Sequence, residues 1–201
     1  MGSLRFFNPY EEIRFTQNLL PHWQQKGAAY FVTFRLADSI PARLRARWEE
    51  ERATWLRFHR EPWDSETEQE YHRRFSAAIE RWLDAGHGSC IFRQNDYAKI
   101  VDHALRHFDG KRLALISSVV MPNHVHALFV QNPEHPLEDL LHSWKTFTSR
   151  NVNRLVGRSG NLWQRSYFDR LVRDEKHFRN CVRYIRRNPE KAHLLPGEYI
   201  L

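Results

Sequence analysis

Two apolar segments separated by Pro122 and Asn123 constrain the fold of this chain most strongly. Residues 112–121 (RLALISSVVM) and 124–131 (HVHALFVQ) have strand length and composition, and the turn residues between them favour a β-hairpin. Around the hairpin, the hydrophobic pattern predicts strands at 29–36 and 162–172 and helices at 95–109 and 136–156. The order β-α-β-β-α-β predicts an α+β fold, a ferredoxin-like (RRM-like) antiparallel sheet with helices on one face.

The remaining segments surround this predicted sheet. Residues 1–28 are expected to form an irregular leader, and residues 40–85 a helical insertion after the first strand, interrupted at Pro62. A C-terminal helix is predicted over 174–188, ending at Asn188 because the residue before a proline disfavours the helical region. The chain has 201 residues, 41% of them hydrophobic, so we expect a single domain over 1–201.

The positive charge of the chain is confined to its last third. Residues 141–201 hold 13 Lys and Arg against 5 Asp and Glu, whereas residues 1–140 hold 18 against 19. A localised basic surface indicates a polyanionic partner, most often nucleic acid. A basic face that only keeps the protein in solution explains the charge equally well.

Other bulk features exclude whole classes of protein. No apolar run approaches the ~20 residues needed to cross a membrane, and the first ten residues lack the apolar core of a secretory signal. Cys90 and Cys181 are too few for a disulfide framework or a four-cysteine zinc site. We therefore expect a cytoplasmic protein without membrane contact, associated with the nucleoid if its partner is DNA.

His124 and His126 are the first candidate site residues. Side chains two apart on a strand point to the same face, and two adjacent imidazoles form half of a divalent-metal site. The alternative is a pair of ordinary histidines at a strand edge. The strand is otherwise apolar, however, and burying two histidines there without partners would cost several kcal/mol (about 2–7 for each polar group).

Tyr184 and Asn188 share one face of the predicted C-terminal helix, one turn apart. Asn188 could supply a third, oxygen ligand to the metal, with Tyr184 beside it. A metal and a phenol together are equipped to attack a phosphodiester, because the metal polarises the phosphoryl oxygen and the phenol is a nucleophile. The alternative is a tyrosine that only packs in the core.

Several motifs resemble those of a known family. Residues 121–128 (MPNHVHAL) resemble the His-hydrophobe-His motif of the single-tyrosine (Y1) transposases of the IS200-like group. Residues 184–189 (YIRRNP), followed by Lys191 and Ala192, resemble the tyrosine-helix motif of its REP-associated tyrosine transposase branch. Residues 83–90 (LDAGHGSC) and 162–165 (LWQR) also resemble that branch, so the likeness extends over most of the chain from about residue 28.

The resemblance implies a function and a mechanism. His124 and His126 would bind Mg²⁺ or Mn²⁺ with Asn188 as third ligand, where the insertion-sequence relatives usually have Gln. Tyr184 would attack single-stranded DNA, form a 5′-phosphotyrosine link and release a 3′-hydroxyl that can reverse the step on another strand. The implied substrate is a repetitive, palindromic hairpin with a short flanking guide sequence, and no nucleotide cofactor is needed. The branch can act as a monomer, which we favour, although insertion-sequence relatives exchange the tyrosine helix within dimers.

Basic residues around the tyrosine helix fit a DNA partner, because arginine forms forked contacts with phosphate. The candidates are Lys145, Arg150, Arg165, Arg170, Arg173, Arg179, Arg183, Arg186 and Arg187.

Rival readings differ in testable ways. A histidine-triad hydrolase needs a third histidine at position 128, which is Leu. Rolling-circle initiators typically carry a Lys shortly after the tyrosine, whereas here residues 185–188 are IRRN. A domesticated hairpin-binding protein that no longer cleaves DNA is the main alternative, and a structural protein with a fortuitous motif is the last.

Overall fold

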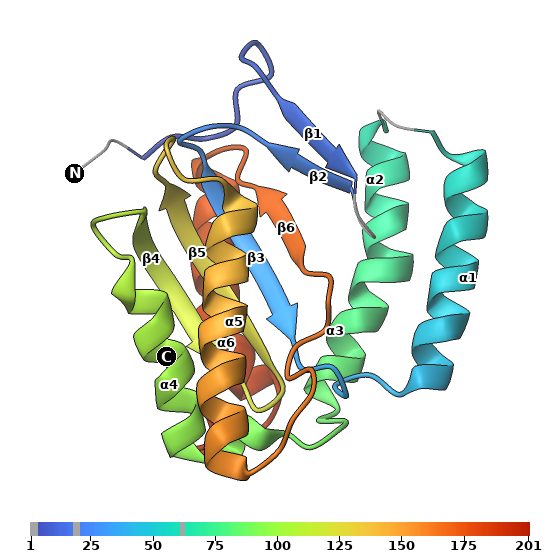
Figure 1. Ribbon diagram of the computed structural model, residues 1–201. Coiled ribbons are helices and arrows are strands. Elements are labelled where there is room, and N and C mark those ends of the chain that lie inside the picture. The colour runs from blue at the N-terminus through green and yellow to red at the C-terminus, as the bar shows by residue number, and fades with distance from the viewer. Residues whose placement is uncertain (1–3, 18–20, 61–62) are drawn as a thin grey trace.

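The computed structural model describes residues 4–17, 21–60 and 63–201 (Figure 1). Its centre is a four-stranded antiparallel sheet with strand order β4-β5-β3-β6. The strands are β3 (Ala29–Arg35), β4 (Leu113–Val120), β5 (His124–Gln131) and β6 (Phe168–Leu171). Helices α4 (Asn95–His107) and α5 (Leu137–Val156) connect them, and a short 3₁₀ turn, η2 (Ile91–Arg93), precedes α4. The predicted ferredoxin-like order of elements is confirmed.

One face of the sheet packs against α4 and α5 and forms the main apolar core. Alternate residues of β3 and β5, such as Phe34 and Phe129, point to this face and are almost fully buried. The Trp144 ring of α5 packs edge-on against Phe129, with 5.5 Å between ring centroids. Burying side chains of this size contributes about 1.5–3 kcal/mol each, so this face fixes the register of the strands.

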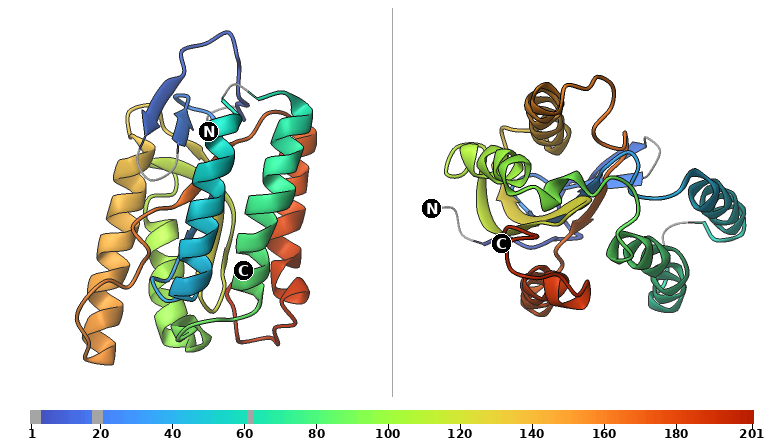
Figure 2. Two further views of the ribbon diagram at one scale, coloured as in Figure 1. Left: turned by 90° about the vertical axis from the view of Figure 1, so that its right-hand side faces the viewer. Right: turned by 90° about the horizontal axis from the view of Figure 1, so that it is seen from below.

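The opposite face of the sheet is covered by α6 (Glu175–Lys191), as the view from below in Figure 2 shows. The Asp174 side chain caps this helix by accepting a hydrogen bond from the His177 backbone N–H at 2.7 Å. Leu128 and Ile185 pack together in the apolar cluster beneath it. The helices predicted within the βαββαβ unit do lie on one face, and α6 occupies the other.

The predicted end of this helix at Asn188 is wrong, because α6 continues through Pro189 to Lys191. A proline at this position removes the hydrogen bond that its own N–H would have made and crowds the carbonyl four residues earlier. The backbone N–H groups of Ala192 and Leu194 then donate to the carbonyls of Asn188 and Pro189 and close the helix end.

The segment between β3 and α4 is helical, as predicted for 40–85, and we call it the insertion. It consists of α1 (Ala42–Phe58), α2 (Ser65–Tyr71), a π-helix η1 (His72–Ser76) and α3 (Ala77–Asp84). Trp48, Trp55, Tyr71 and Phe75 form its separate apolar cluster. The insertion stands beside β6 at the edge of the sheet (Figures 1 and 2).

Two predicted segments need correction. The leader is not irregular throughout, because β1 (Arg14–Gln17) and β2 (Pro21–Gln24) form an antiparallel pair, with Pro21 at the start of a strand where it is tolerated. The predicted strand at 162–172 is reduced to β6. Just before it, the Gln164 N–H donates to the Arg35 carbonyl of β3, and an isolated bridge joins Leu36 to Trp163, whose ring packs into the core against Phe34.

None of the helices in the described ranges combines the length and the apolar character needed to cross a membrane.

Candidate active site

The two histidines lie on the face of the sheet that α6 covers. Strand alternation puts Val125 and Ala127 into the main core and turns both imidazoles to the other side, as predicted. His124 is 1% exposed and His126 is 3% exposed. Their Nε2 atoms lie 3.0 Å apart, so both rings present the same nitrogen to a shared point.

Each imidazole is oriented by a hydrogen bond at its other nitrogen. His124 Nδ1 lies 2.7 Å from Asn123 Oδ1, and Asn123 Nδ2 donates to the carbonyls of Leu83 and His87 at 3.2 and 3.3 Å. The amide oxygen of Asn123 is therefore the acceptor, and His124 Nδ1 carries its proton, which leaves a lone pair on Nε2. His126 Nδ1 lies 2.7 Å from Thr33 Oγ1, a hydroxyl that can donate or accept.

Burial keeps both imidazoles neutral. Desolvation lowers the pKa of His124 to about 3, and the nearby Arg35 cation acts in the same direction. Desolvation, reinforced by the neighbouring His124, also lowers the pKa of His126 well below its ordinary value. Neutral imidazole is the form that binds metal ions, so the protein supplies these groups ready for coordination.

Tyr184 lies against this pair. Its ring packs edge-on against His126 at 5.1 Å between centroids and against Phe31 at 5.7 Å. Burial raises the pKa of the phenol well above its ordinary value, and the carboxylates of Glu80 and Asp84 on α3 raise it further. The hydroxyl is thus protonated at neutral pH, and its proton must leave during any attack.

Asn188 lies one helical turn beyond Tyr184, at 1% exposure. Within the part of the chain that the structure describes, neither its Oδ1 nor its Nδ2 has a hydrogen-bond partner. Side-chain interactions of Asn188 with both groups nevertheless partly offset the effect of burial, because they favour a higher pKa for His124 and a lower pKa for Tyr184. A buried amide without a partner costs about 1–3 kcal/mol, which a bound ligand would recover.

These observations fit a divalent cation. The described residues contain no cluster of three or more His, Cys, Asp or Glu side chains suited to a metal ion. Two neutral imidazoles and the unpartnered amide of Asn188 nevertheless offer two nitrogens and one oxygen in the same place, a mixed donor set that a divalent ion such as Mn²⁺ accepts. The residues present therefore fit the Mg²⁺ or Mn²⁺ site that the sequence implied.

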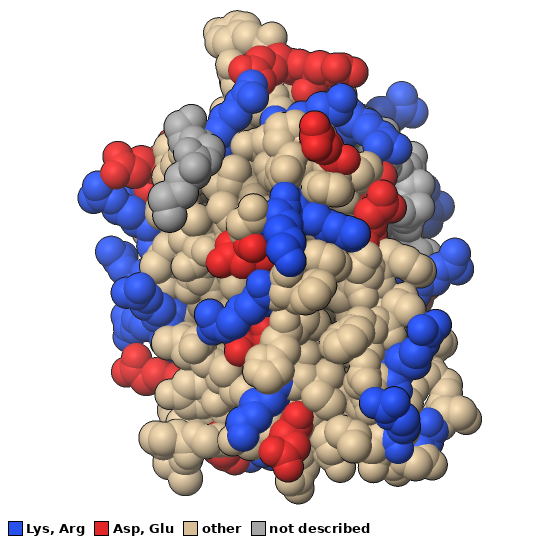
Figure 3. All heavy atoms as spheres, turned by 60° about the vertical axis from the view of Figure 1, so that its left-hand side comes forward, with Lys and Arg blue, Asp and Glu red and all other residues tan. Residues whose placement is uncertain are grey.

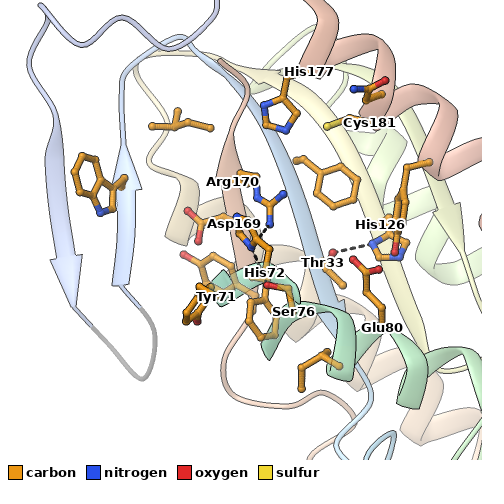
Figure 4. A pocket seen from close by; sticks show the side chains of 18 of the residues that line it. Thr33, Tyr71, His72, Ser76, Glu80, His126, Asp169, Arg170, His177 and Cys181 are labelled. Atoms are coloured by element: carbon orange, nitrogen blue, oxygen red, sulfur yellow. Dashed lines mark hydrogen bonds between the residues drawn. The ribbon is translucent and has the colours of Figure 1, made fainter. Parts of the chain in front are cut away.

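A pocket of about 780 Å³ opens beside Tyr184 and His126, between the insertion and the sheet. We call it the insertion pocket. Figure 4 shows Thr33 and His126 on one side and His72, Ser76 and Glu80 of the insertion facing them. The sequence did not predict that the insertion forms one wall of this pocket, because the local pattern of residues 40–85 does not indicate where the insertion packs.

The nine predicted DNA-binding residues occupy different environments. Arg170 and Arg173 line the insertion pocket. Lys145 is half-buried, and its ammonium donates to the backbone carbonyls of Gln164 and Arg165 at 2.7 and 2.8 Å. The other six are exposed: Arg150, Arg165, Arg179, Arg183, Arg186 and Arg187. Their role in DNA binding stays a prediction.

Charge is mixed elsewhere on the surface. On the face in Figure 3, basic and acidic side chains are interspersed and do not separate into patches.

One buried cation that the sequence analysis did not identify is Arg35, which is opposite His124 in the strand register and 6% exposed. Burial and the neighbouring Arg45 lower its pKa to about 10, and its guanidinium lies over the Phe168 ring.

Comparison with known proteins identifies the family. Residues 90–188 match the family described as "Transposase IS200 like", a segment that contains both histidines, Tyr184 and Asn188. The chain belongs to the IS200-like transposase family. The chain resembles a Haemophilus influenzae protein named as a REP-associated tyrosine transposase, with 25% identity over 107 residues. The match covers 48% of this chain and 59% of that protein, so the chain spans less than two thirds of its relative's length.

One solved structure supports the fold of this chain. A REP-associated tyrosine transposase bound to a REP hairpin superposes with a TM-score of 0.51 at 16% identity, covering 87% of this chain and 73% of that one. This likeness shows a shared fold. A Deinococcus radiodurans protein described as a transposase is 14% identical over 92% of this chain and 98% of that chain, with a TM-score of 0.33, which is too low to support a shared fold.

Proposed function

We propose that this chain cleaves and rejoins single-stranded DNA through a covalent link to Tyr184. One observation carries the proposal: the Tyr184 ring packs against His126, whose Nε2 faces that of His124 at 3.0 Å, with the unpartnered amide of Asn188 one turn away. Nucleophile and metal-ligating groups thus converge within one chain. This supports a site that is complete in a monomer.

In the proposed step, the phenol oxygen of Tyr184 attacks phosphorus, and the bond from phosphorus to the 3′-oxygen breaks. The products are a 5′-phosphotyrosine and a free 3′-hydroxyl, and the proton lost by the phenol balances the one gained by the 3′-oxygen. The bond energy stays in the new phosphodiester, so the reverse attack on another strand needs no nucleotide cofactor.

His124, His126 and Asn188 would hold Mg²⁺ or Mn²⁺. When bound, such an ion polarises the phosphoryl oxygen and offsets the negative charge that develops during attack. The chain itself supplies neutral imidazoles, fixes His124 through Asn123 and keeps the phenol protonated until attack.

The proposed substrate is a DNA hairpin with single-stranded flanks. The names of the relatives support it, since both carry the term REP-associated tyrosine transposase and one was solved with a REP hairpin. The basic surplus of residues 141–201 also suits a polyanion. Such a protein would act on DNA at the nucleoid, in the cytoplasm.

Incubation with a hairpin that carries single-stranded flanks and a label at its 3′ end tests the proposal. With Mn²⁺, the wild-type protein should form a labelled band that survives denaturing electrophoresis. Tyr184→Phe should form none, while binding the hairpin within about tenfold of the wild type, since it loses only one hydroxyl, whose hydrogen bond contributes about 0.5–1.5 kcal/mol. Tyr10→Phe, at a 96% exposed tyrosine, is the matched control.

The same experiment separates the non-cleaving alternative. A protein that binds the hairpin without a covalent band, with either metal, is a DNA-binding protein that has lost cleavage. A band that persists in Tyr184→Phe shows that another residue is the nucleophile.

A further inference from the structure

The insertion pocket extends from the proposed nucleophile to an aromatic end. His126, which packs against Tyr184, lies at one side and Tyr71 at the other (Figure 4), with the Trp63 ring against Tyr71; Trp23 also lines the pocket. Its volume of about 780 Å³ falls within the roughly 300–1,000 Å³ of typical ligand pockets. A strand of DNA cleaved at Tyr184 would pass this opening.

The register of the sheet places Arg170 near the nucleophile. Arg170 pairs with Phe31 across β6 and β3, so both side chains project to the same face of the sheet. Adjacent strands are about 4.8 Å apart. Because the Phe31 ring contacts Tyr184, the arginine lies one strand spacing from a residue that touches the nucleophile.

The insertion holds this arginine in place. Arg170 Nη2 lies 3.1 Å from His72 Nδ1, and the same ring nitrogen is 3.0 Å from Ser76 Oγ. An arginine can only donate, so His72 Nδ1 is the acceptor. This bond uses one of the five N–H donors of the guanidinium. Figure 4 shows the pair at the centre of the pocket.

His72 and Ser76 are the first and last residues of the π-helix η1. π-helical turns are rare and occur frequently at functional sites. Side chains four residues apart, such as these two, also share a face of an ordinary α-helix. Through the His72 ring, the insertion is hydrogen-bonded to Arg170 and does not only pack beside the sheet.

The aromatic end suits a base. The Trp63 and Tyr71 rings lie 4.7 Å apart between centroids at 35°, and Trp23, which also lines the pocket, is 37% exposed. Base–aromatic stacking stabilises a bound strand and accepts any sequence. Arg52, Arg170 and Arg173 among the lining residues outnumber the carboxylates Glu80 and Asp169, which suits an anion with one phosphate.

We propose that the insertion pocket binds one unpaired nucleotide adjacent to the cleaved phosphodiester, with Arg170 on its phosphate and its base at the aromatic end. The proposal rests on the proposed function, because it assumes that DNA reaches Tyr184. It gives the insertion, which precedes the segment matched to the family, a direct role in holding substrate.

A phosphate scan tests the pocket. The probe is a labelled DNA hairpin with six-thymidine flanks, in which single flank phosphates are replaced one at a time by uncharged methylphosphonates. Wild-type protein should lose about tenfold in affinity at one position near the cleaved bond, and an abasic nucleotide there should also weaken binding. A charge-assisted hydrogen bond of about 1.5–3 kcal/mol corresponds to this loss or more.

Arg170→Gln should bind the unmodified probe about tenfold more weakly and show no further loss at that methylphosphonate, while Arg170→Lys should retain part of the affinity. Arg106→Gln, an exposed residue of α4 whose guanidinium pairs with Asp102 at 2.9 Å, removes the same charge elsewhere and should change affinity less than twofold. Thermal unfolding of each variant checks that the chain remains folded.

Three outcomes would overturn the pocket proposal: equal losses for Arg170→Gln and Arg106→Gln, a methylphosphonate profile that Arg170→Gln leaves unchanged, or equal binding of flanked and flankless hairpins by the wild type. The covalent band through Tyr184 is scored in the same samples. Its absence in the wild type contradicts the proposed function, whereas its presence with any of these three outcomes contradicts the pocket alone.

Discussion

The two walls of the insertion pocket are held by different kinds of interaction. The wall formed by β5 and α6 presents His126 to the pocket, whereas its neighbours His124 and Asn188 do not line it; all three are at most 3% exposed, and the imidazoles are fixed by hydrogen bonds of 2.7 Å. The insertion has its own aromatic cluster, and part-exposed ion pairs join it to α6. Lys191 Nζ lies 2.9 Å from Asp84 and 3.8 Å from Glu80.

This difference suggests that the β5–α6 wall carries out cleavage and that the insertion contacts the substrate. Buried polar groups tolerate little change, because each lost partner costs about 1–3 kcal/mol, whereas partly exposed ion pairs contribute about 0–1 kcal/mol. The family match covers the first wall and begins after the insertion. Changes in the β5–α6 wall should therefore abolish cleavage, and changes in the insertion should alter substrate binding.

The largest expected effect is the loss of both histidines. The double variant His124→Ala, His126→Ala should lower the cleavage rate by at least about 1,000-fold, because metal assistance supplies several kcal/mol. Hairpin affinity should change less than about threefold, since phosphate contacts dominate it. Rates come from the covalent band, and excess EDTA should reduce wild-type cleavage equally.

The matched control for this variant is His103→Ala, His107→Ala, at two exposed positions of α4. A double variant at His124 and His126 that cleaves within tenfold of this control would contradict the division between the walls.

Replacing the buried amide comes next. Asn188→Leu should weaken Mn²⁺ binding by about 10–100-fold in calorimetric titration, a loss that removing a hydrogen-bond partner of a metal ligand already causes. Without metal, the same variant should raise the free energy of unfolding by about 1–2 kcal/mol, because it removes a buried polar group that has no partner.

A metal ligand and a packing residue are distinguished because the first predicts weaker Mn²⁺ binding together with higher stability in the absence of metal. If Asn188→Leu lowers stability in EDTA and leaves Mn²⁺ affinity unchanged, Asn188 is structural.

Asn123 connects the two walls, since it binds His124 and the carbonyls of Leu83, in the last turn of α3, and of His87, which follows α3. Asn123→Ala should lower Mn²⁺ affinity by about tenfold, because the proton position on His124 is no longer fixed. Asn132→Ala, which removes a similar bond to the Lys111 carbonyl on the surface, is the control. Equal Mn²⁺ affinities for the two variants would show that Asn123 only holds the turn.

The smallest effect concerns the ion pairs that join the insertion to α6. Asp84→Asn should lower the free energy of unfolding by less than about 1 kcal/mol in urea titrations and reduce cleavage less than threefold. High salt should diminish the difference from the wild type. A loss of cleavage comparable to that of the histidine variant would mean that the insertion takes part in the cleavage reaction, which would contradict the proposed division between the two walls.

Local rules predicted one wall of the pocket and not the other. Strand alternation put His124 and His126 on one face, and the spacing of Tyr184 and Asn188 put them on one face of a helix. Both expectations depend on residues close in sequence. The contact of Thr33 with His126 depends on pairing between strands 93 positions apart, and the contact of His72 with Arg170 spans 98. Patterns within one element cannot specify such docking.

The corrections have the same cause. The rule for residues before proline ended α6 at Asn188, yet packing of its last turn against the sheet and bonds from Ala192 and Leu194 extend the helix. The polar composition of the leader hid β1 and β2, because each strand is four residues long and gains its order by pairing with the other.

The most direct test of the central claim is the polarity of the covalent link. The hairpin probe is labelled either at its 5′ end or at its 3′ end, cleaved in Mn²⁺, and separated under denaturing conditions. A 5′-phosphotyrosine at Tyr184 predicts that only the 3′-end label stays with the protein, in a peptide containing Tyr184, and that the 5′-labelled fragment has a 3′-hydroxyl that a polymerase extends. Retention of the 5′-end label on the protein, or attachment to a peptide without Tyr184, would contradict the account.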